Sequence, residues 1–212
     1  METPSEKYIR EHSTGQTEAL KWIQQQSHIR TNYPRMISGA MQGQFLKMLV
    51  EMLKPRKILE IGTFTGYSAA CMAMGLPEGG HIETLEINDE LEDLIREGWS
   101  RAGVSDLITL HIGDAKETLS QMGTETFDLV FMDANKREYC EYYDLFFDLV
   151  SPGGFILADD VLWSGKVFED PMPQDRQTLG IASFNDKIAA DPRTESVILP
   201  IREGLNLIRK IK

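Results

Sequence analysis

The stretch Lys57-Ile-Leu-Glu-Ile-Gly-Thr-Phe-Thr-Gly-Tyr-Ser68 predicts a buried strand that ends in a glycine loop and continues into a helix. This order of elements presents backbone N–H groups and a helix N-terminus to a polar ligand. Three residues separate Gly62 from Gly66, so the loop lacks the Gly-x-Gly-x-x-Gly fingerprint of dinucleotide sites. It also lacks the Gly-Lys-Ser/Thr ending of a P-loop. The loop therefore favours a nucleoside ligand without a pyrophosphate.

Length and composition indicate one α/β domain over residues 1–212, because 42% hydrophobic and 26% charged residues are ordinary values for a globular chain. A formal net charge of −11 argues against a nucleic-acid partner. No signal-peptide pattern and no apolar run of membrane-spanning length is present, so we expect a cytoplasmic protein without a membrane contact. Cys71 and Cys140 are expected to be packed free thiols of a reducing compartment.

Two regions follow one another along the chain. Residues 1–55 are predicted to be a helical cap, with amphipathic helices over 13–26 and 40–53 joined by a connector over 28–39. Residues 56–212 are predicted to be a Rossmann-like core. Its parallel strands are expected at 57–61, 81–86, 107–111, 127–132 and 154–159, and its helices at 66–75, 88–102, 114–122 and 137–149.

This alternation predicts a mainly parallel sheet with helices on both faces. Two further β-rich runs, 196–201 and 205–211, are separated by Arg202-Glu203-Gly204 and predict a C-terminal antiparallel hairpin. The sheet then has seven strands, which is the layout of many class I S-adenosylmethionine-dependent methyltransferases. Ligands of open α/β sheets lie beyond the carboxyl ends of the strands, so the strand ends are the candidate site.

The first three strand ends carry acidic residues. Glu60 lies inside an apolar strand, where a carboxylate is costly unless it is paired or close to a ligand. Glu86 is placed to accept hydrogen bonds from both hydroxyls of a ribose, and Asn88 is expected to cap the next helix. For Asp114 a helix cap is the favoured interpretation, and an Asp114–Ala115 turn against an adenine is the alternative.

Strands four and five both end in carboxylates, Asp133 in one case and Asp159 and Asp160 in the other. If the two strands are neighbours, the three side chains converge and suit a hard cation such as Mg²⁺, Mn²⁺ or Ca²⁺. Lys136 brings an amine to the same rim, where a metal lowers its pKa and makes it a candidate general base. Helix caps, a solvated loop and a surface lysine are the alternatives.

The order and spacing of these segments resemble the cation-dependent O-methyltransferases, a family that includes catechol and caffeoyl-CoA O-methyltransferases. The resemblance covers roughly residues 30–212. Its motifs are Leu59-Glu-Ile-Gly-Thr-Phe-Thr-Gly-Tyr-Ser68, Leu85-Glu86, Gly113-Asp-Ala115, Met132-Asp-Ala-Asn-Lys136 and Asp159-Asp-Val-Leu-Trp-Ser-Gly165. Arg35-Met-Ile-Ser38 with Gln42-Gly-Gln44 resembles the family segment that closes over the cofactor.

The resemblance implies a role for each group of residues. Contacts to S-adenosylmethionine are expected at Ser38, Glu60, Gly62, Ser68, Glu86, Ala115 and Asp133, and we add Thr63 and Asp114 to this set. Metal ligands are expected at Asp133, Asp159 and Asp160, and the catalytic base at Lys136. A homodimer is also implied.

Two positions depart from the family pattern. Asp160 stands where the family usually has Asn, so we expect metal binding to be kept or tightened and the bound catechol to be less acidic. Glu203 stands where members often carry Asp before the Gly, and it either orients the substrate or sits in the hairpin turn. The arm before about residue 25 matches no family segment, so recognition of coenzyme A is unsupported.

The predicted reaction is methyl transfer from S-adenosylmethionine to one hydroxyl of a catechol-type aromatic small molecule. Trp163, Tyr139 and Glu203 are the candidate substrate contacts, and core packing is the alternative for at least two of Tyr139, Tyr142 and Tyr143. Residues 167–178 are expected to form a mobile loop near the site. The competing functions are a non-catalytic or non-catechol S-adenosylmethionine-binding protein and a methyltransferase acting on a macromolecule. A nicotinamide dehydrogenase is disfavoured by the missing fingerprint.

Overall fold

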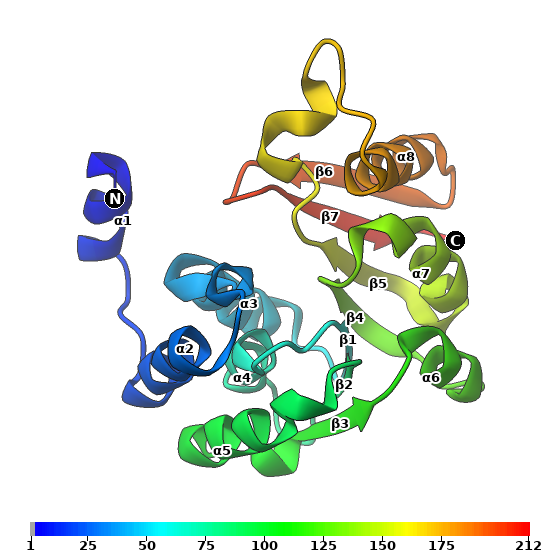
Figure 1. Ribbon diagram of the computed structural model, residues 1–212. Coiled ribbons are helices and arrows are strands. Elements are labelled where there is room, and N and C mark those ends of the chain that lie inside the picture. The colour runs from blue at the N-terminus through cyan, green and yellow to red at the C-terminus, as the bar shows by residue number, and fades with distance from the viewer. Residues whose placement is uncertain (1–2) are drawn as a thin grey trace.

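One sheet organises residues 3–212, which are the residues that the computed structural model describes (Figure 1). Its strand order is β3-β2-β1-β4-β5-β7-β6. The strands are β1 (Lys57–Ile61), β2 (His81–Glu86), β3 (Ile108–Ile112), β4 (Phe127–Met132), β5 (Val150–Ala158), β6 (Thr194–Leu199) and β7 (Leu205–Lys210). The first five strands pair in parallel, and β7 is antiparallel to both β5 and β6. This confirms the predicted sheet and its terminal hairpin.

Helices cover both faces of this sheet (Figure 1). They are α1 (Pro4–Glu11), α2 (Glu18–Arg30), α3 (Gly39–Leu53), α4 (Tyr67–Ala73), α5 (Glu92–Ala102), α6 (Ala115–Gln121), α7 (Tyr139–Phe146) and α8 (Arg176–Ala190). In Figure 1, α2 to α5 lie on one side of the sheet, α6 to α8 lie on the other, and α1 stands apart from both groups. Among residues 3–212, none of the helices combines the length and apolar character needed to cross a bilayer.

Alternate side chains of the central strand, β4, pack into two hydrophobic cores, one on each face of the sheet. Leu129 and Phe131 of β4 pack in the core beneath α3, α4 and α5, whereas Val130 and Met132 pack in the core beneath α7 and α8. A strand buried on both faces needs apolar residues at every position, which is why Phe127-Asp-Leu-Val-Phe-Met132 is almost continuously apolar.

Several boundaries differ from the sequence prediction. The helix expected over 13–26 is α2, which begins after Thr17 because the Thr17 hydroxyl accepts a hydrogen bond from Leu20 N at 3.3 Å. Strand β5 begins at Val150, four residues earlier than expected. The segment expected as a loop over 167–178 is partly helical, since residues 163–168 form a short 3-10 helix and α8 begins at Arg176. Cys71 and Cys140 are free thiols, as predicted.

Candidate active site

The glycine loop after β1 lies against the end of β4, its parallel neighbour. Gly62 has a backbone φ of +98°, and a Cβ atom at this position would lie 2.1 Å from the carbonyl oxygen of Asp133. A side chain is therefore excluded both by the left-handed conformation and by space. The hydrogen bond from Asp133 N to Ile61 O, 2.9 Å long, holds the two strand ends together. Glycine at position 62 thus brings the loop and Asp133 to one place.

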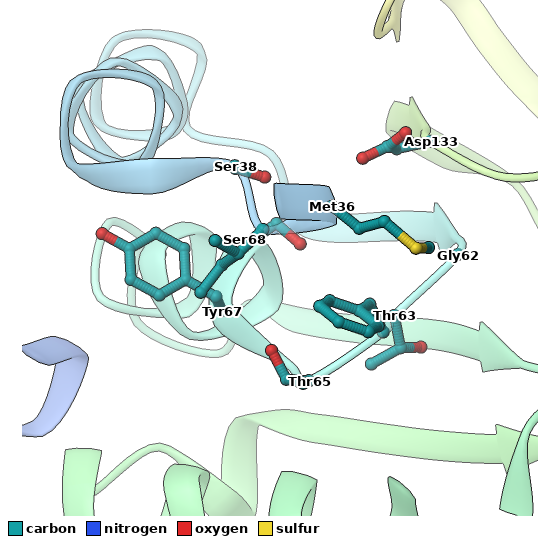
Figure 2. A pocket seen from close by; sticks show the side chains of 10 residues that line it. Met36, Ser38, Gly62, Thr63, Thr65, Tyr67, Ser68 and Asp133 are labelled. Atoms are coloured by element: carbon teal, nitrogen blue, oxygen red, sulfur yellow. The ribbon is translucent and has the colours of Figure 1, made fainter. Parts of the chain in front are cut away.

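A pocket opens at this point, beyond the carboxyl ends of the strands. Figure 2 shows the Met36 side chain extending across it toward Gly62, with Asp133 on the side of β4. The lining comes from the segment before α3, the glycine loop, the start of α4 and the end of β4. Its residues are Met36, Ile37, Ser38, Gly62, Thr63, Phe64, Thr65, Tyr67, Ser68 and Asp133. Five of the predicted cofactor residues are among them: Ser38, Gly62, Thr63, Ser68 and Asp133.

Glu60 lies below the pocket and does not line it. Its carboxyl group is fully buried and accepts hydrogen bonds from the hydroxyls of Ser68 and Thr84, each 2.5 Å long. The Thr84 hydroxyl lies 2.6 Å from the hydroxyl of Thr63. Burial raises the pKa of Glu60 to about 8, although the two hydroxyl bonds act in the opposite direction. Glu60 therefore supports Ser68 and Thr63 from beneath the pocket.

Glu86 ends β2 beside the glycine loop. Its carboxylate accepts hydrogen bonds from Phe64 N at 2.6 Å and Asn88 N at 2.9 Å. Burial raises the pKa of Glu86, and the backbone N–H groups oppose that rise. Asp114 caps α6 by accepting a 2.7 Å bond from Lys116 N, as predicted, and Ala115 is the first residue of that helix.

Pairing between β4 and β5 brings the predicted acidic residues to one edge of the sheet. Lys136 Nζ lies 2.5 Å from Asp133 Oδ1 and 2.9 Å from Asp160 Oδ2. The Lys136 side chain is only 7% exposed, so these are not solvated surface contacts. The third carboxylate, on Asp159, faces Gln42 instead: its Oδ2 accepts a 2.5 Å bond from Gln42 Nε2. Among residues 3–212, no three His, Cys, Asp or Glu side chains are arranged together as a metal-binding group.

Asp133, Asp159 and Asp160, together with Lys136, are called the acidic cluster below. Burial and nearby charges shift the pKa values of Asp133, Asp159 and Lys136. Burial raises the pKa of Asp159 to about 8, and the neighbouring charges of Asp133 and Asp160 act in the same direction. The pKa of Asp133 is also raised by burial, against the positive charge of Lys136. For Lys136 burial lowers the pKa, but the surrounding acidic groups outweigh burial and hold it well above its usual range. That direction is opposite to the one predicted beside a metal, because here the carboxylates act on the ammonium directly.

The three predicted substrate contacts have different surroundings. Tyr139 is fully buried, with its hydroxyl 2.7 Å from Lys136 Nζ and 3.0 Å from Asp159 O, so it supports the cluster from the core. This places Tyr139 with the packing alternative, as for the other two tyrosines of α7. Trp163 is half-buried, and its indole N–H is buried without a hydrogen-bond partner among the described residues. Glu203 accepts bonds from Ser164 N at 2.5 Å and Ser164 Oγ at 2.9 Å, which ties the hairpin turn to the loop after β5.

Comparison with known proteins assigns this chain to a family. The family model for O-methyltransferases matches residues 10–211. The chain belongs to the O-methyltransferase family. A probable caffeoyl-CoA O-methyltransferase 2 of Dictyostelium discoideum is 34% identical over 96% of this chain and 90% of its own length. The mouse catechol O-methyltransferase domain-containing protein 1 is 36% identical over 80% of this chain and 66% of its own length.

Solved structures of bacterial O-methyltransferases share the whole fold. The Bacillus cereus enzyme in complex with S-adenosylhomocysteine superimposes with a TM-score of 0.91 at 31% identity, covering 99% of this chain and 98% of that one. TomG of Streptomyces achromogenes, solved with S-adenosylmethionine, has a TM-score of 0.89 at 30% identity, covering 100% of this chain and 97% of that one. The protein is therefore an S-adenosylmethionine-dependent O-methyltransferase with a class I methyltransferase fold.

Several contacts of the candidate site were outside the sequence prediction. Tyr67 and Thr65 line the pocket, and Arg202 contacts Ser38 at the start of α3. Gln42 was predicted only as part of the segment that closes over the cofactor, and the structure shows that it contacts Asp159. Gln42 carried a usable signal, because it is a polar residue on the buried face of a helix and such a side chain needs a hydrogen-bond partner. Arg202 carried none, since a charged residue in a hairpin turn is ordinarily solvated.

Proposed function

We propose that this O-methyltransferase transfers a methyl group to one hydroxyl of a catechol-type aromatic small molecule, and that the transfer depends on a divalent cation. The observation that carries the proposal is the position of Asp133. It lines the cofactor pocket and also pairs with Lys136 in the acidic cluster, so the methyl donor and the catalytic groups meet at one residue.

The donor set of the cluster fits a hard cation. Carboxylate oxygens are the preferred ligands of Mg²⁺, Mn²⁺ and Ca²⁺, and Asp133, Asp159 and Asp160 all lie at the same end of β4 and β5. These three residues would hold the cation. A bound cation supplies Lewis acidity, which lowers the pKa of the two catechol hydroxyls. Asp133 and Asp160 already gather around a positive charge, that of Lys136.

Lys136 is the group that we assign to proton transfer. The acidic groups around Lys136 favour its ammonium form, so the side chain must first release its own proton. As a free amine, its Nζ then accepts the proton of the reacting hydroxyl while that oxygen forms a bond to the methyl carbon and the carbon–sulfur bond breaks. The ammonium that results is stabilised by Asp133 and Asp160, which lie 2.5 Å and 2.9 Å from Nζ. The other pocket residues contribute by holding donor and acceptor in line.

The acceptor side is supported by Trp163. A buried indole N–H without a partner is uncommon in a folded protein, and an oxygen of a bound acceptor satisfies it. An aromatic ring beside the acidic edge also suits a planar substrate. We propose a small-molecule acceptor and no nucleic-acid partner, in keeping with the net charge of −11, and we retain the homodimer as a proposal.

The test is methyl transfer from labelled S-adenosylmethionine to a simple catechol, caffeate, caffeoyl-CoA and a monophenol, each with Mg²⁺ and with excess EDTA. We expect turnover of a vicinal diol that EDTA abolishes and added Mg²⁺ restores. Asp133→Asn should remove this activity, and the exposed Asp144→Asn serves as the matched control. Turnover that survives EDTA would refute the cation assignment, and turnover of the monophenol alone would refute the catechol assignment.

A further inference from the structure

We propose that Arg202, in the turn between β6 and β7, is a positioning residue that aligns the cofactor pocket with the acidic cluster. This inference rests on the proposed function in placing the reaction at these two sites. Arg202 is 164 residues away from Ser38 along the chain, yet its guanidinium reaches the wall of the pocket.

One nitrogen of the guanidinium makes both contacts on the pocket side. Arg202 Nη1 donates to the carbonyl oxygen of Ser38 and, at 3.1 Å, to Oε1 of Gln42. Ser38 is a pocket residue at the N-terminal end of α3, and Gln42 lies one turn further along the same helix. The guanidinium therefore fixes the start of α3 at the point where the cofactor segment enters it.

Gln42 passes this constraint to the acidic cluster. While its Oε1 accepts from Arg202, its Nε2 donates to Asp159 Oδ2 at 2.5 Å. Gln42 and Asp159 are both buried, at 0% and 1% exposure, so neither group exchanges its partner for water at low cost. A single orientation of the amide satisfies both contacts, because its oxygen must face the arginine and its NH₂ the carboxylate.

The charge of Arg202 also acts on the pocket. Burial raises the pKa of Tyr67, and the positive charge of Arg202 opposes that rise. Tyr67 lines the pocket together with Ser38, whose carbonyl oxygen the guanidinium contacts directly. The charge of Arg202 therefore acts at the pocket wall, where its hydrogen bonds also lie.

The turn that carries Arg202 is itself held firmly. Leu162 N donates to Glu203 O at 2.7 Å, and Val161 N donates to Gly204 O at 3.0 Å. The neighbouring Glu203 side chain holds Ser164, next to the proposed acceptor residue Trp163. A rigid turn is what a positioning residue needs, since its own movement would be passed on to the site.

The two contacts predict two separable effects. Arg202→Met removes the support of Ser38 and of Gln42, so we expect the Kd for S-adenosylhomocysteine to rise about tenfold and kcat to fall as well. Gln42→Met leaves the bond from Arg202 to Ser38 in place, so we expect kcat to fall with the Kd for S-adenosylhomocysteine unchanged within about twofold. Arg202→Lys keeps the charge and should recover part of the loss of Arg202→Met.

The experiment is calorimetric titration of the full chain with S-adenosylhomocysteine, combined with steady-state kinetics on the best acceptor. Arg209→Met is the matched control, because Arg209 lies in the same hairpin and makes an exposed ion pair with Glu195. Equal affinities for Arg202→Met and Arg209→Met would overturn the proposal. If Arg202→Met does not fold, Gln42→Met still tests the proposal. A weakened affinity for S-adenosylhomocysteine or an unchanged kcat in Gln42→Met would contradict the role of Gln42 as the link between Arg202 and Asp159. If the proposed function itself is wrong, the unsubstituted enzyme will not methylate a catechol in a cation-dependent way. The comparison of S-adenosylhomocysteine affinities does not depend on that result.

Discussion

Removal of the Lys136 ammonium should destabilise the folded protein strongly. In Lys136→Met the stem of the side chain is kept, but Asp133 Oδ1 and Asp160 Oδ2 lose a positive partner that lies 2.5 Å and 2.9 Å away. Taking one partner from a buried ion pair costs about 3–5 kcal/mol, because the remaining charge is left uncompensated. In a chain of this length each kcal/mol lowers Tm by about 2–4 °C, so we expect Tm to fall by about 6–20 °C.

The assay is differential scanning calorimetry in EDTA, repeated over a titration with Mn²⁺. Lys187→Met is the control: its Nζ lies 2.6 Å from Asp144 Oδ1, but the two side chains are 31% and 62% exposed, against 7% for Lys136. An exposed pair of this kind contributes about 0–1 kcal/mol. Because Mn²⁺ supplies the missing charge to the same carboxylates, it should raise the Tm of Lys136→Met more than that of the unsubstituted protein.

Two results would refute this reasoning separately. If Lys136→Met and Lys187→Met have the same Tm in EDTA, the ammonium does not balance Asp133 and Asp160. If Lys136→Met is destabilised but Mn²⁺ raises its Tm no more than that of the unsubstituted protein, the carboxylates do not form a cation site.

Three further changes test other parts of the site. Burial raises the pKa of Glu60 in the folded state to about 8, against 4.5 for the free group. The free energy of unfolding should therefore fall by about 1.4 kcal/mol per pH unit as the pH rises from 4.5 to about 8. Glu60→Gln should make the slope shallower by that amount and leave the part that Asp159 contributes, which urea unfolding at a series of pH values measures. Gly62→Ala places Cβ 2.1 Å from Asp133 O and should cost about 3–5 kcal/mol in thermal unfolding. Asp160→Asn should weaken Mg²⁺ binding in calorimetry and shift the rate profile to lower pH, and unchanged values would contradict the charge argument.

The parallel part of the sheet could be predicted from the sequence because each of its five strands ends in, or is followed by, a glycine or a carboxylate. Helix α8 could not be found in the same way, although Ile181, Phe184 and Ile188 have the spacing of a buried helical face. Two prolines shortly before it and Gly180 within it indicate a loop when composition is weighed alone. The N-cap Asp175, which accepts from Gln177 N at 3.1 Å and from Thr178 N at 3.0 Å, is what starts the helix.

The same distinction, between local pattern and tertiary packing, separates the site residues that could be predicted from those that could not. Asp133 and Asp159 could be predicted because the carboxyl ends of parallel strands meet at one edge whatever the details of packing. The contact from Gln42 to Asp159 joins residues 117 positions apart, and the contact from Arg202 to Ser38 joins residues 164 positions apart. Such contacts depend on how α3 and the hairpin dock on the sheet, which no local pattern encodes.

Two cations serve the acidic edge in different ways. Lys136 contacts Asp133 directly and so neutralises it, which suits a group that exchanges a proton with the substrate. Arg202 reaches Asp159 only through the neutral amide of Gln42, which orients the carboxylate without pairing a charge against it. In the proposed function Asp159 therefore stays available to the cation, whereas a second lysine in place of Gln42 would compete with that cation for the carboxylate. The proposal thus gives a reason for an amide, rather than an amine, on the buried face of α3.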